Sequence, residues 1–150
     1  MTYKMKTTKK KKKTSNTMTR SKLIKELDKQ FSLFIRMRDA NKKGIVTCPL
    51  CWAKMPWQKA QNMHFIKRSV MAFRWDEDNC HAGCMRCNVI LNGNYIEYTR
   101  WMQKKYGIET IDEAIRKSKE VCKISTPEIL EMITYYRGQN ENLAYKFLIH

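Results

Sequence analysis

Apolar residues recur at three- and four-residue steps between Ser21 and Asn41, which is the spacing of one face of an α-helix. Ser21 is a residue type that caps helix N-termini, and Asn41 and Gly44 are typical of a helix end. We interpret the apolar stripe as a face that packs into a core, with a dimer contact as the alternative. The stripe consists of Leu23, Ile24, Leu27, Phe31, Phe34, Ile35 and Met37.

The helical spacing is lost over residues 44–78. Residues 45–46 lead into a cysteine motif, and residues 63–66 suit a short strand. This region therefore predicts a small β-hairpin with long turns. A helix is expected to begin near Asn79 or soon after, to carry Cys84 and Cys87, and to be interrupted soon afterwards by an Asn-Gly-Asn sequence.

Three further helices are predicted in the C-terminal part of the chain. Gly107 is suited to end the first of them. The last has clear start signals, with Ser125 or Thr126 as the cap and Pro127 in the first turn. Their predicted ranges are 95–106, 111–121 and 127–136.

The chain has the length of one ordinary domain. Residues 1–19 contain Lys, Thr and Ser with little to bury, so we expect a disordered basic tail there. The tail could be an arm that seeks phosphates or merely a solubilising segment. We predict one mostly helical α+β domain over 20–150, which divides into an N-terminal helix (20–43), a core (44–106) and C-terminal helices (107–150).

The charge balance is strongly basic, with 30 Lys and Arg against 14 Asp and Glu and a formal net charge of +16. Residues 1–20 hold eight of these cations, and the remaining 22 still outnumber the acids. A charge of this size is typically offset by a polyanionic partner such as nucleic acid. The sequence shows no apolar run long enough to cross a membrane and no secretory signal, so we expect a cytoplasmic protein.

Six cysteines in a reducing compartment are more often metal ligands than disulfides. Two Cys-x-x-Cys pairs stand out, and two such pairs can complete a tetrahedral Cys₄ zinc site. A structural zinc would also supply folding free energy to an irregular segment. Cys80 and Cys122 fit neither pair and are interpreted as core residues, although Cys80 is near enough in sequence to compete as a ligand. The predicted zinc ligands are Cys48, Cys51, Cys84 and Cys87.

The order of these motifs resembles a zinc-bound HNH (ββα-metal) nuclease. In that pattern a His follows the first cysteine pair, an Asn precedes the second pair, and an Asn or His follows it. The matching positions here are His64, Asn79 and Asn88. The second pair and its Asn are also similar to recombination endonuclease VII. The resemblance implies a ββα-metal core flanked by the N-terminal helix and the C-terminal helices.

A longer similarity links the chain to the NinG/Rap family of phage recombination proteins. It runs from about Lys25 to Gly107, which is more than half of the chain, and is more specific than one cysteine motif. The resemblance implies a phage or prophage endonuclease that acts on branched DNA, such as Holliday junctions. The similar stretches are residues 28–40, 48–51, 64–68, 74–88, 92–94 and 105–107, with Tyr98.

Phosphodiester cleavage needs a base that activates water and a divalent cation that stabilises charge, here Mg²⁺ or Mn²⁺. We assign the base to His64, because neutral imidazole titrates in the right range. The amide oxygen of Asn88 suits a hard cation. Asn79 is expected to hold the loop that orients His64. Phosphate contacts are assigned to Lys67, Arg68 and Arg74.

One position departs from the HNH pattern. Many HNH enzymes carry a metal-binding acid directly before the catalytic His, whereas this chain has Met63. The first protein ligand of the catalytic cation is therefore not identified by the motif. His81 is the leading candidate, and Asp76 and Asp78 are weaker ones; His81 could equally contact DNA or cap a helix.

Two other functions share the basic charge and the cysteine motifs. The first is a non-catalytic zinc module that binds DNA as a recombination accessory, which leaves His64 and Asn88 without a role. The second is an RNA-binding zinc protein, for which Trp52, Trp57 and Trp75 could stack on bases. Because a four-way junction needs two cuts and the chain has one candidate site, a homodimer is expected on junctions. The N-terminal helix or the C-terminal helices are the expected contact.

Overall fold

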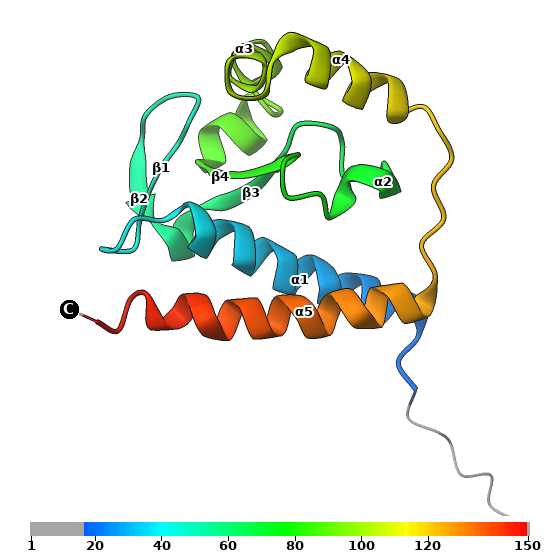
Figure 1. Ribbon diagram of the computed structural model, residues 1–150. Coiled ribbons are helices and arrows are strands. Elements are labelled where there is room, and N and C mark those ends of the chain that lie inside the picture. The colour runs from blue at the N-terminus through cyan, green and yellow to red at the C-terminus, as the bar shows by residue number, and fades with distance from the viewer. Residues whose placement is uncertain (1–16, 150) are drawn as a thin grey trace, which may run out of the picture.

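Two 20-residue helices lie side by side and form the base of the molecule, α1 (Arg20–Asp39) and α5 (Thr126–Tyr145) (Figure 1). The structure is a computed structural model that describes residues 17–149. It is α+β and mostly helical, as predicted. Most of the predicted basic tail lies outside the described residues.

Helix α1 begins one residue before the predicted cap. The hydroxyl of Thr19, rather than that of Ser21, accepts the hydrogen bond from the backbone N–H of Lys22, at 3.4 Å. The predicted apolar stripe is buried, apart from the partly buried Ile24. Because this stripe packs within the chain, it offers no apolar face for the dimer contact that was the alternative.

Helix α5 is nine residues longer than predicted at its C-terminal end. Its start matches the prediction, because Ser125 and Glu128 form a reciprocal capping box. The extension continues through Gly138 because the C-terminal half still packs on α1. There Asn140 is buried and donates to the backbone carbonyl of Gln30 at 3.0 Å. The ring of Tyr136 lies between those of Phe31 and Phe34, at centroid distances of 5.0 and 5.1 Å.

Two small antiparallel sheets follow α1, where one hairpin was predicted. Strands β1 (Ile45–Thr47) and β2 (Lys54–Pro56) form the first sheet. Strands β3 (Gln61–His64) and β4 (Cys80–Gly83) form the second, which packs on α1 (Figure 1). The helix expected near Asn79 is wrong in its first part, because that stretch is β4. All four residues of β4 are buried, so the strand shows no alternation of polar and apolar positions that sequence analysis could detect.

Three short helical turns lie between or after these strands. Turn η1 (Trp57–Lys59) joins β2 to β3, α2 (Met71–Arg74) lies in the loop between β3 and β4, and η2 (Arg86–Ile90) follows β4 and contains Cys87. Helix α3 (Tyr95–Tyr106) has the predicted bounds, whereas α4 (Ile108–Lys117) begins three residues earlier and ends four residues earlier than predicted.

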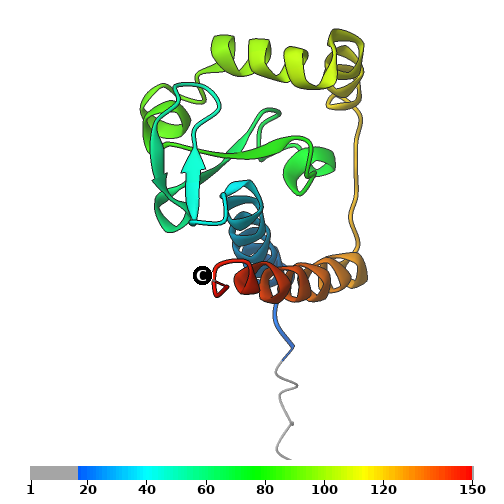
Figure 2. The same ribbon diagram turned by 60° about the vertical axis from the view of Figure 1, so that its left-hand side comes forward.

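Helices α3 and α4 meet at Gly107, whose φ of +89° favours glycine. They cover a second apolar core around the four motif cysteines, separate from the core between α1, α5 and the β3–β4 sheet. An extended segment links α4 to α5 along one side of the molecule (Figure 2). Within residues 17–149 the structure contains no helix long and apolar enough to span a membrane.

Candidate functional site

The two cysteine pairs converge, as predicted. The Sγ atoms of Cys48, Cys51, Cys84 and Cys87 all lie within 4.8 Å of one another. A tetrahedral zinc with bonds of about 2.3 Å places its sulfurs roughly 3.8 Å apart. The turn between β1 and β2 supplies the first pair, whereas Cys84 directly follows β4 and Cys87 lies in η2. The four thiolates could therefore hold a metal ion such as zinc.

The other two cysteines lie away from this cluster. Cys80 is fully buried in β4 and faces the backbone carbonyl of Arg74, with a sulfur–oxygen distance of 4.0 Å. Burial raises the pKa of the Cys80 thiol far above its ordinary value. Cys122 is exposed in the segment between α4 and α5, so its assignment to the core is wrong. Cys80 lies outside the four-cysteine cluster and is therefore not placed to compete as a metal ligand.

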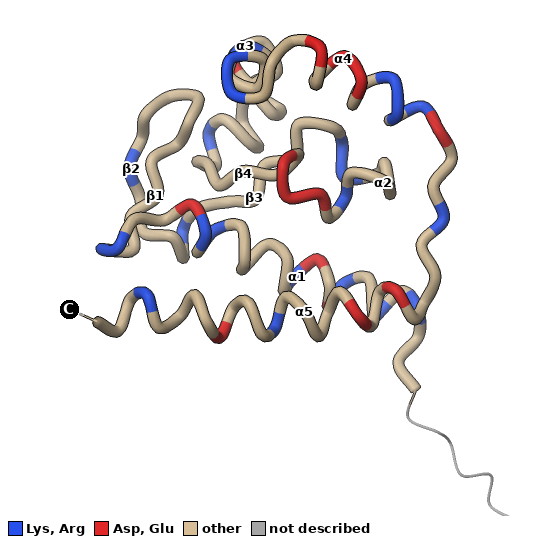
Figure 3. The backbone as a smooth tube through the Cα atoms, in the orientation of Figure 1, with Lys and Arg blue, Asp and Glu red and all other residues tan. Residues whose placement is uncertain are grey.

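A basic pocket of about 660 Å³ lies between α1, β3 and η2. His64 and Asn88 line it, from two different elements. Five cations share the lining with one acid, Asp28, so the pocket is suited to an anion. Acids gather elsewhere, in the loop before β4 and along α4 (Figure 3). The five cations are Arg36, Lys59, Lys67, Arg68 and Arg74.

His64 ends β3, and its Nε2 lies 2.9 Å from the backbone carbonyl oxygen of Arg74. A carbonyl oxygen only accepts hydrogen bonds, so Nε2 carries the proton in the neutral ring and Nδ1 keeps its lone pair. Burial lowers the pKa of His64, and the positive charge of Arg68 lowers it further, while the hydrogen bond to the carbonyl and the charge of Asp28 act in the opposite direction. The ring is therefore neutral at neutral pH and can accept a proton at Nδ1.

Asn79 does not line the pocket but closes the long loop between β3 and β4. Its Oδ1 accepts from the backbone N–H of Ile66 at 2.7 Å, and its Nδ2 donates to the carbonyl oxygens of Ile66 and Phe73, each at 3.0 Å. These three bonds fix the segment that follows His64. The contacts are those expected of a residue that holds the loop.

Asn88 lies in η2 and ties this turn to the start of β3. Its Nδ2 donates to the Oε1 of Gln61 at 2.9 Å. Because the amide nitrogen makes this bond, the amide oxygen is the atom that Asn88 could offer to a cation.

Among the predicted phosphate contacts, Arg74 differs from the other two. Its Nε and Nη2 donate to the two carboxylate oxygens of Asp28, at 2.9 and 2.6 Å. The edge of the guanidinium that could donate two hydrogen bonds to a phosphate is therefore already paired with Asp28. Lys67 and Arg68 are exposed and line the pocket.

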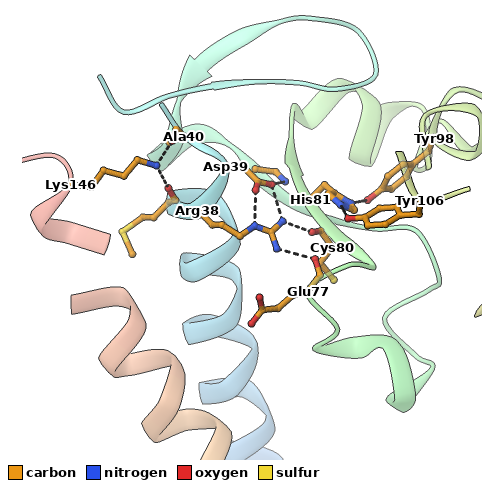
Figure 4. A network of polar contacts seen from close by, with 11 residues as sticks. Arg38, Asp39, Ala40, Glu77, Cys80, His81, Tyr98, Tyr106 and Lys146 are labelled. Carbon is orange, nitrogen blue, oxygen red and sulfur yellow. Dashed lines mark hydrogen bonds and ion pairs between the residues drawn. The ribbon is translucent and has the colours of Figure 1, made fainter. Parts of the chain in front are cut away.

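His81 is not placed where a ligand of the catalytic cation was expected. In the β3–β4 ladder it pairs with Met63, whereas His64 pairs with Cys80, so the two histidines point to opposite faces of the sheet. His81 is 2% exposed, and its Nδ1 and Nε2 lie 2.9 and 2.8 Å from the hydroxyls of Tyr98 and Tyr106 (Figure 4).

The hydroxyl of Tyr98 donates to the carbonyl of Met63 at 3.2 Å, so it accepts from Nδ1 of His81, and the hydroxyl of Tyr106 donates to Nε2. Burial lowers the pKa of His81 to about 3, which keeps the ring neutral. His81 is thus a core hydrogen-bonding residue. Asp76 and Asp78, the weaker candidates for the cation, also lie outside the basic pocket.

Several pocket residues were not assigned to the site by the sequence analysis, and three of them bear on its chemistry. They are Asp28, which holds Arg74, Gln61, which holds Asn88, and Asn62, which has a buried Oδ1 without a partner in the described part of the chain. The alternation along β3 places Asn62 on the same face as His64. The sequence did offer a sign of Asp28, because this residue begins the first of the stretches that are similar to the NinG/Rap family.

Fold and site together define a small α+β protein with a four-cysteine cluster that could bind a metal and a basic pocket beside it. The chain belongs to the family of the Bacteriophage Lambda NinG protein, whose family model matches residues 2–145. A curated relative, the protein ninG of Salmonella phage P22, is 29% identical over 131 residues, which is 83% of this chain. The match spans 63% of the length of that relative. No solved structure matches the chain significantly.

Proposed function

We propose that this chain is a structure-specific endonuclease of the HNH type that cleaves phosphodiester bonds in branched DNA with the help of a divalent cation. The supporting observation is that His64 and Asn88, from separate elements, line the same basic pocket. In this proposal, β3 and β4 are the two strands of a ββα-metal core, the long loop joins them, and η2 is its helix. His64 ends the first strand, Asn79 closes the loop and Asn88 lies on the helical turn.

The roles follow from the chemistry of each group. Nδ1 of His64 takes the proton from a water molecule that attacks phosphorus, while Nε2 stays bonded to the carbonyl of Arg74. Lys67 and Arg68 hold the phosphate that lies in the pocket. A bound Mg²⁺ or Mn²⁺ would stabilise charge on the phosphate and on the leaving oxygen, and Asn88 would hold it through its amide oxygen. The four thiolates would hold zinc as a structural ion, because a Cys₄ set leaves no open coordination position.

The first test is cleavage of a labelled four-way junction by the intact chain in Mg²⁺, Mn²⁺ or EDTA. We expect strand cuts at the branch with either cation, no cuts in EDTA, and weaker cleavage of a linear duplex of the same sequence. Tight junction binding without cuts in any cation would favour the alternative, a non-catalytic zinc-containing DNA-binding accessory protein. Tighter binding of structured RNA than of either DNA, compared at the same salt concentration, would favour the RNA-binding alternative.

Asn88 offers a test of the cation site. Asn88→Ala removes the proposed oxygen ligand, and we expect the cleavage rate to fall by about 100-fold together with a higher Mg²⁺ requirement. Asn88→Asp keeps an oxygen and adds a negative charge, so half-maximal activity should need less Mg²⁺. The measurement is the rate of junction cleavage against Mg²⁺ concentration.

Gln58→Ala is a matched control for these variants, because Gln58 lines the same pocket and is exposed. It should leave the Mg²⁺ requirement unchanged. An equal Mg²⁺ requirement in wild type, Asn88→Ala and Asn88→Asp would exclude Asn88 as a ligand.

A further inference from the structure

Asp28 accepts hydrogen bonds from two consecutive residues that lie far from it in the sequence. Its Oδ1 accepts from Nε of Arg74 and from Nε1 of Trp75, each at 2.9 Å, and its Oδ2 accepts from Nη2 of Arg74 at 2.6 Å. The carboxylate side chain is 20% exposed and the guanidinium side chain 16%. One side chain of α1 thus fixes both residues at the C-terminal end of α2.

The segment that Asp28 holds has little stability of its own. Helix α2 has four residues, and its N-cap, Val70, makes no side-chain capping bond. A single helical turn in isolation is unstable, so its position depends on tertiary contacts. Besides the bonds to Asp28, Arg74 lies against the ring of Trp75, with 5.4 Å between the guanidinium carbon and the ring centroid, and Trp75 is buried.

The same segment orients His64. The backbone carbonyl that accepts the Nε2–H of His64 belongs to Arg74, the residue whose side chain Asp28 grips. If this carbonyl moves, the ring loses the bond that selects the Nε2-protonated form and fixes the direction of Nδ1. Asp28 and His64 are thereby connected through one residue.

We propose that Asp28 is a positioning residue for His64, which acts by fixing Arg74 so that its carbonyl holds Nε2–H and leaves Nδ1 free to accept a proton. The proposal rests on the nuclease function proposed above and adds to it a residue of α1, outside the ββα segment. Asp28 is also the one acid among the residues that line the pocket. Its charge opposes that of Arg68 and Arg74 at His64, so its removal would lower the pKa of His64 further.

Glu26 provides a matched control on the same helix. Its Oε1 accepts from Nη2 of Arg137 at 2.8 Å, so it also ties α1 to another element by an arginine–carboxylate pair. Unlike Asp28, Glu26 does not line the basic pocket. Glu26→Gln therefore reports the effect of losing one such pair without any change near His64.

The test reads the tautomer of His64 directly, by ¹⁵N NMR of the histidine rings in the zinc-loaded chain. The sequence holds three histidines, so the signals can be assigned, and His81 serves as an internal reference because its bonds to Tyr98 and Tyr106 lie on the other face of the sheet. We expect Asp28→Asn to give His64 a mixture of tautomers with the signals of His81 unchanged. Glu26→Gln should leave both histidines as in the wild type.

Junction cleavage supplies the second readout. We expect Asp28→Asn to lower kcat by roughly 10- to 100-fold with little change in KM, because the base is misplaced while Lys67 and Arg68 still hold the phosphate. Asp28→Glu keeps the carboxylate and should restore the Nε2-protonated form and part of the rate.

Three results would overturn the proposal. The first is an unchanged tautomer and kcat in Asp28→Asn. The second is a loss that appears in KM alone, which would mean that Asp28 serves DNA binding through Arg74. The third is an equal loss in Glu26→Gln, which would mean general destabilisation. The NMR readout needs no catalysis, so a chain that never cleaves DNA but whose His64 tautomer depends on Asp28 would refute the nuclease function and leave the positioning role standing.

Discussion

His64→Ala is expected to reduce the rate of junction cleavage by about 1,000-fold while junction binding persists. A positioned general base contributes on the order of 100- to 10,000-fold to a proton-transfer step, and alanine removes the only imidazole that lines the basic pocket within residues 17–149. The phosphate contacts expected from Lys67 and Arg68 are untouched by the change. The measurement is single-turnover cleavage of a labelled junction in Mg²⁺, with binding measured separately in EDTA.

The pH dependence of the wild type should identify the same residue. His64 acts as a base only in its neutral form, so the rate should be constant above the pKa of His64 and fall as the pH drops below it. Burial places this pKa below the ordinary value of about 6.5, so the rate at that pH should be more than half of its maximum. An acid limb centred above pH 7 would contradict a buried, neutral His64.

The controls separate catalysis from folding. His64→Ala must keep its zinc and its circular dichroism, since His64 is only partly buried at the end of β3. Cuts that survive His64→Ala at full rate would show that another group is the base.

Sequence analysis was most successful where structure is set by local spacing. The apolar stripe of α1 and the bounds of α3 follow from contacts within a few residues, which the periodicity reports. The cysteine pairs are local as well, and the predicted metal site required the two pairs to converge, as they do. His64, Asn79 and Asn88 were grouped because of the resemblance to the HNH pattern, which specifies the order of these residues along the chain.

The errors have a common physical origin in tertiary contacts. Strand β4 was taken for a helix because it is buried on both faces and pairs with a strand sixteen or more residues earlier. Arg74 was assigned to phosphate because its partner, Asp28, lies 46 residues away. His81 was assigned to a cation because the sequence does not reveal that Tyr98 and Tyr106 reach its ring from α3.

Cys87→Ser is expected to abolish zinc binding and to unfold the half of the molecule built around the cysteine cluster. Structural zinc sites in small domains contribute about 10–16 kcal/mol of apparent binding free energy, whereas whole domains are stable by only about 5–15 kcal/mol. Tyr98, Met102 and Ile111 pack in the same apolar core as Cys87 and would lose their partners. The α1–α5 layer has a core of its own, so part of the helical signal should remain.

The measurements are zinc content per chain, thermal unfolding, and near-ultraviolet circular dichroism, which reports the packing of Trp101 and Tyr98. Wild type should carry one zinc and Cys87→Ser none, with a large fall in Tm. Cys122→Ser is the matched control, because Cys122 is exposed and outside the cluster, and it should keep both its zinc and its Tm. One zinc and an unchanged Tm in Cys87→Ser would refute the Cys₄ site.

Loss of the zinc should also abolish cleavage, although none of the four thiols lines the basic pocket. Strand β4 ends at Gly83, directly before Cys84, and its other end pairs with His64. Asn88 directly follows Cys87 in η2. The proposed base and the proposed cation ligand are thus placed by the segment that contains Cys84 and Cys87. Cys87→Ser should therefore lose zinc, fold and activity together, whereas His64→Ala should lose activity alone, and this contrast separates the structural metal from the chemistry.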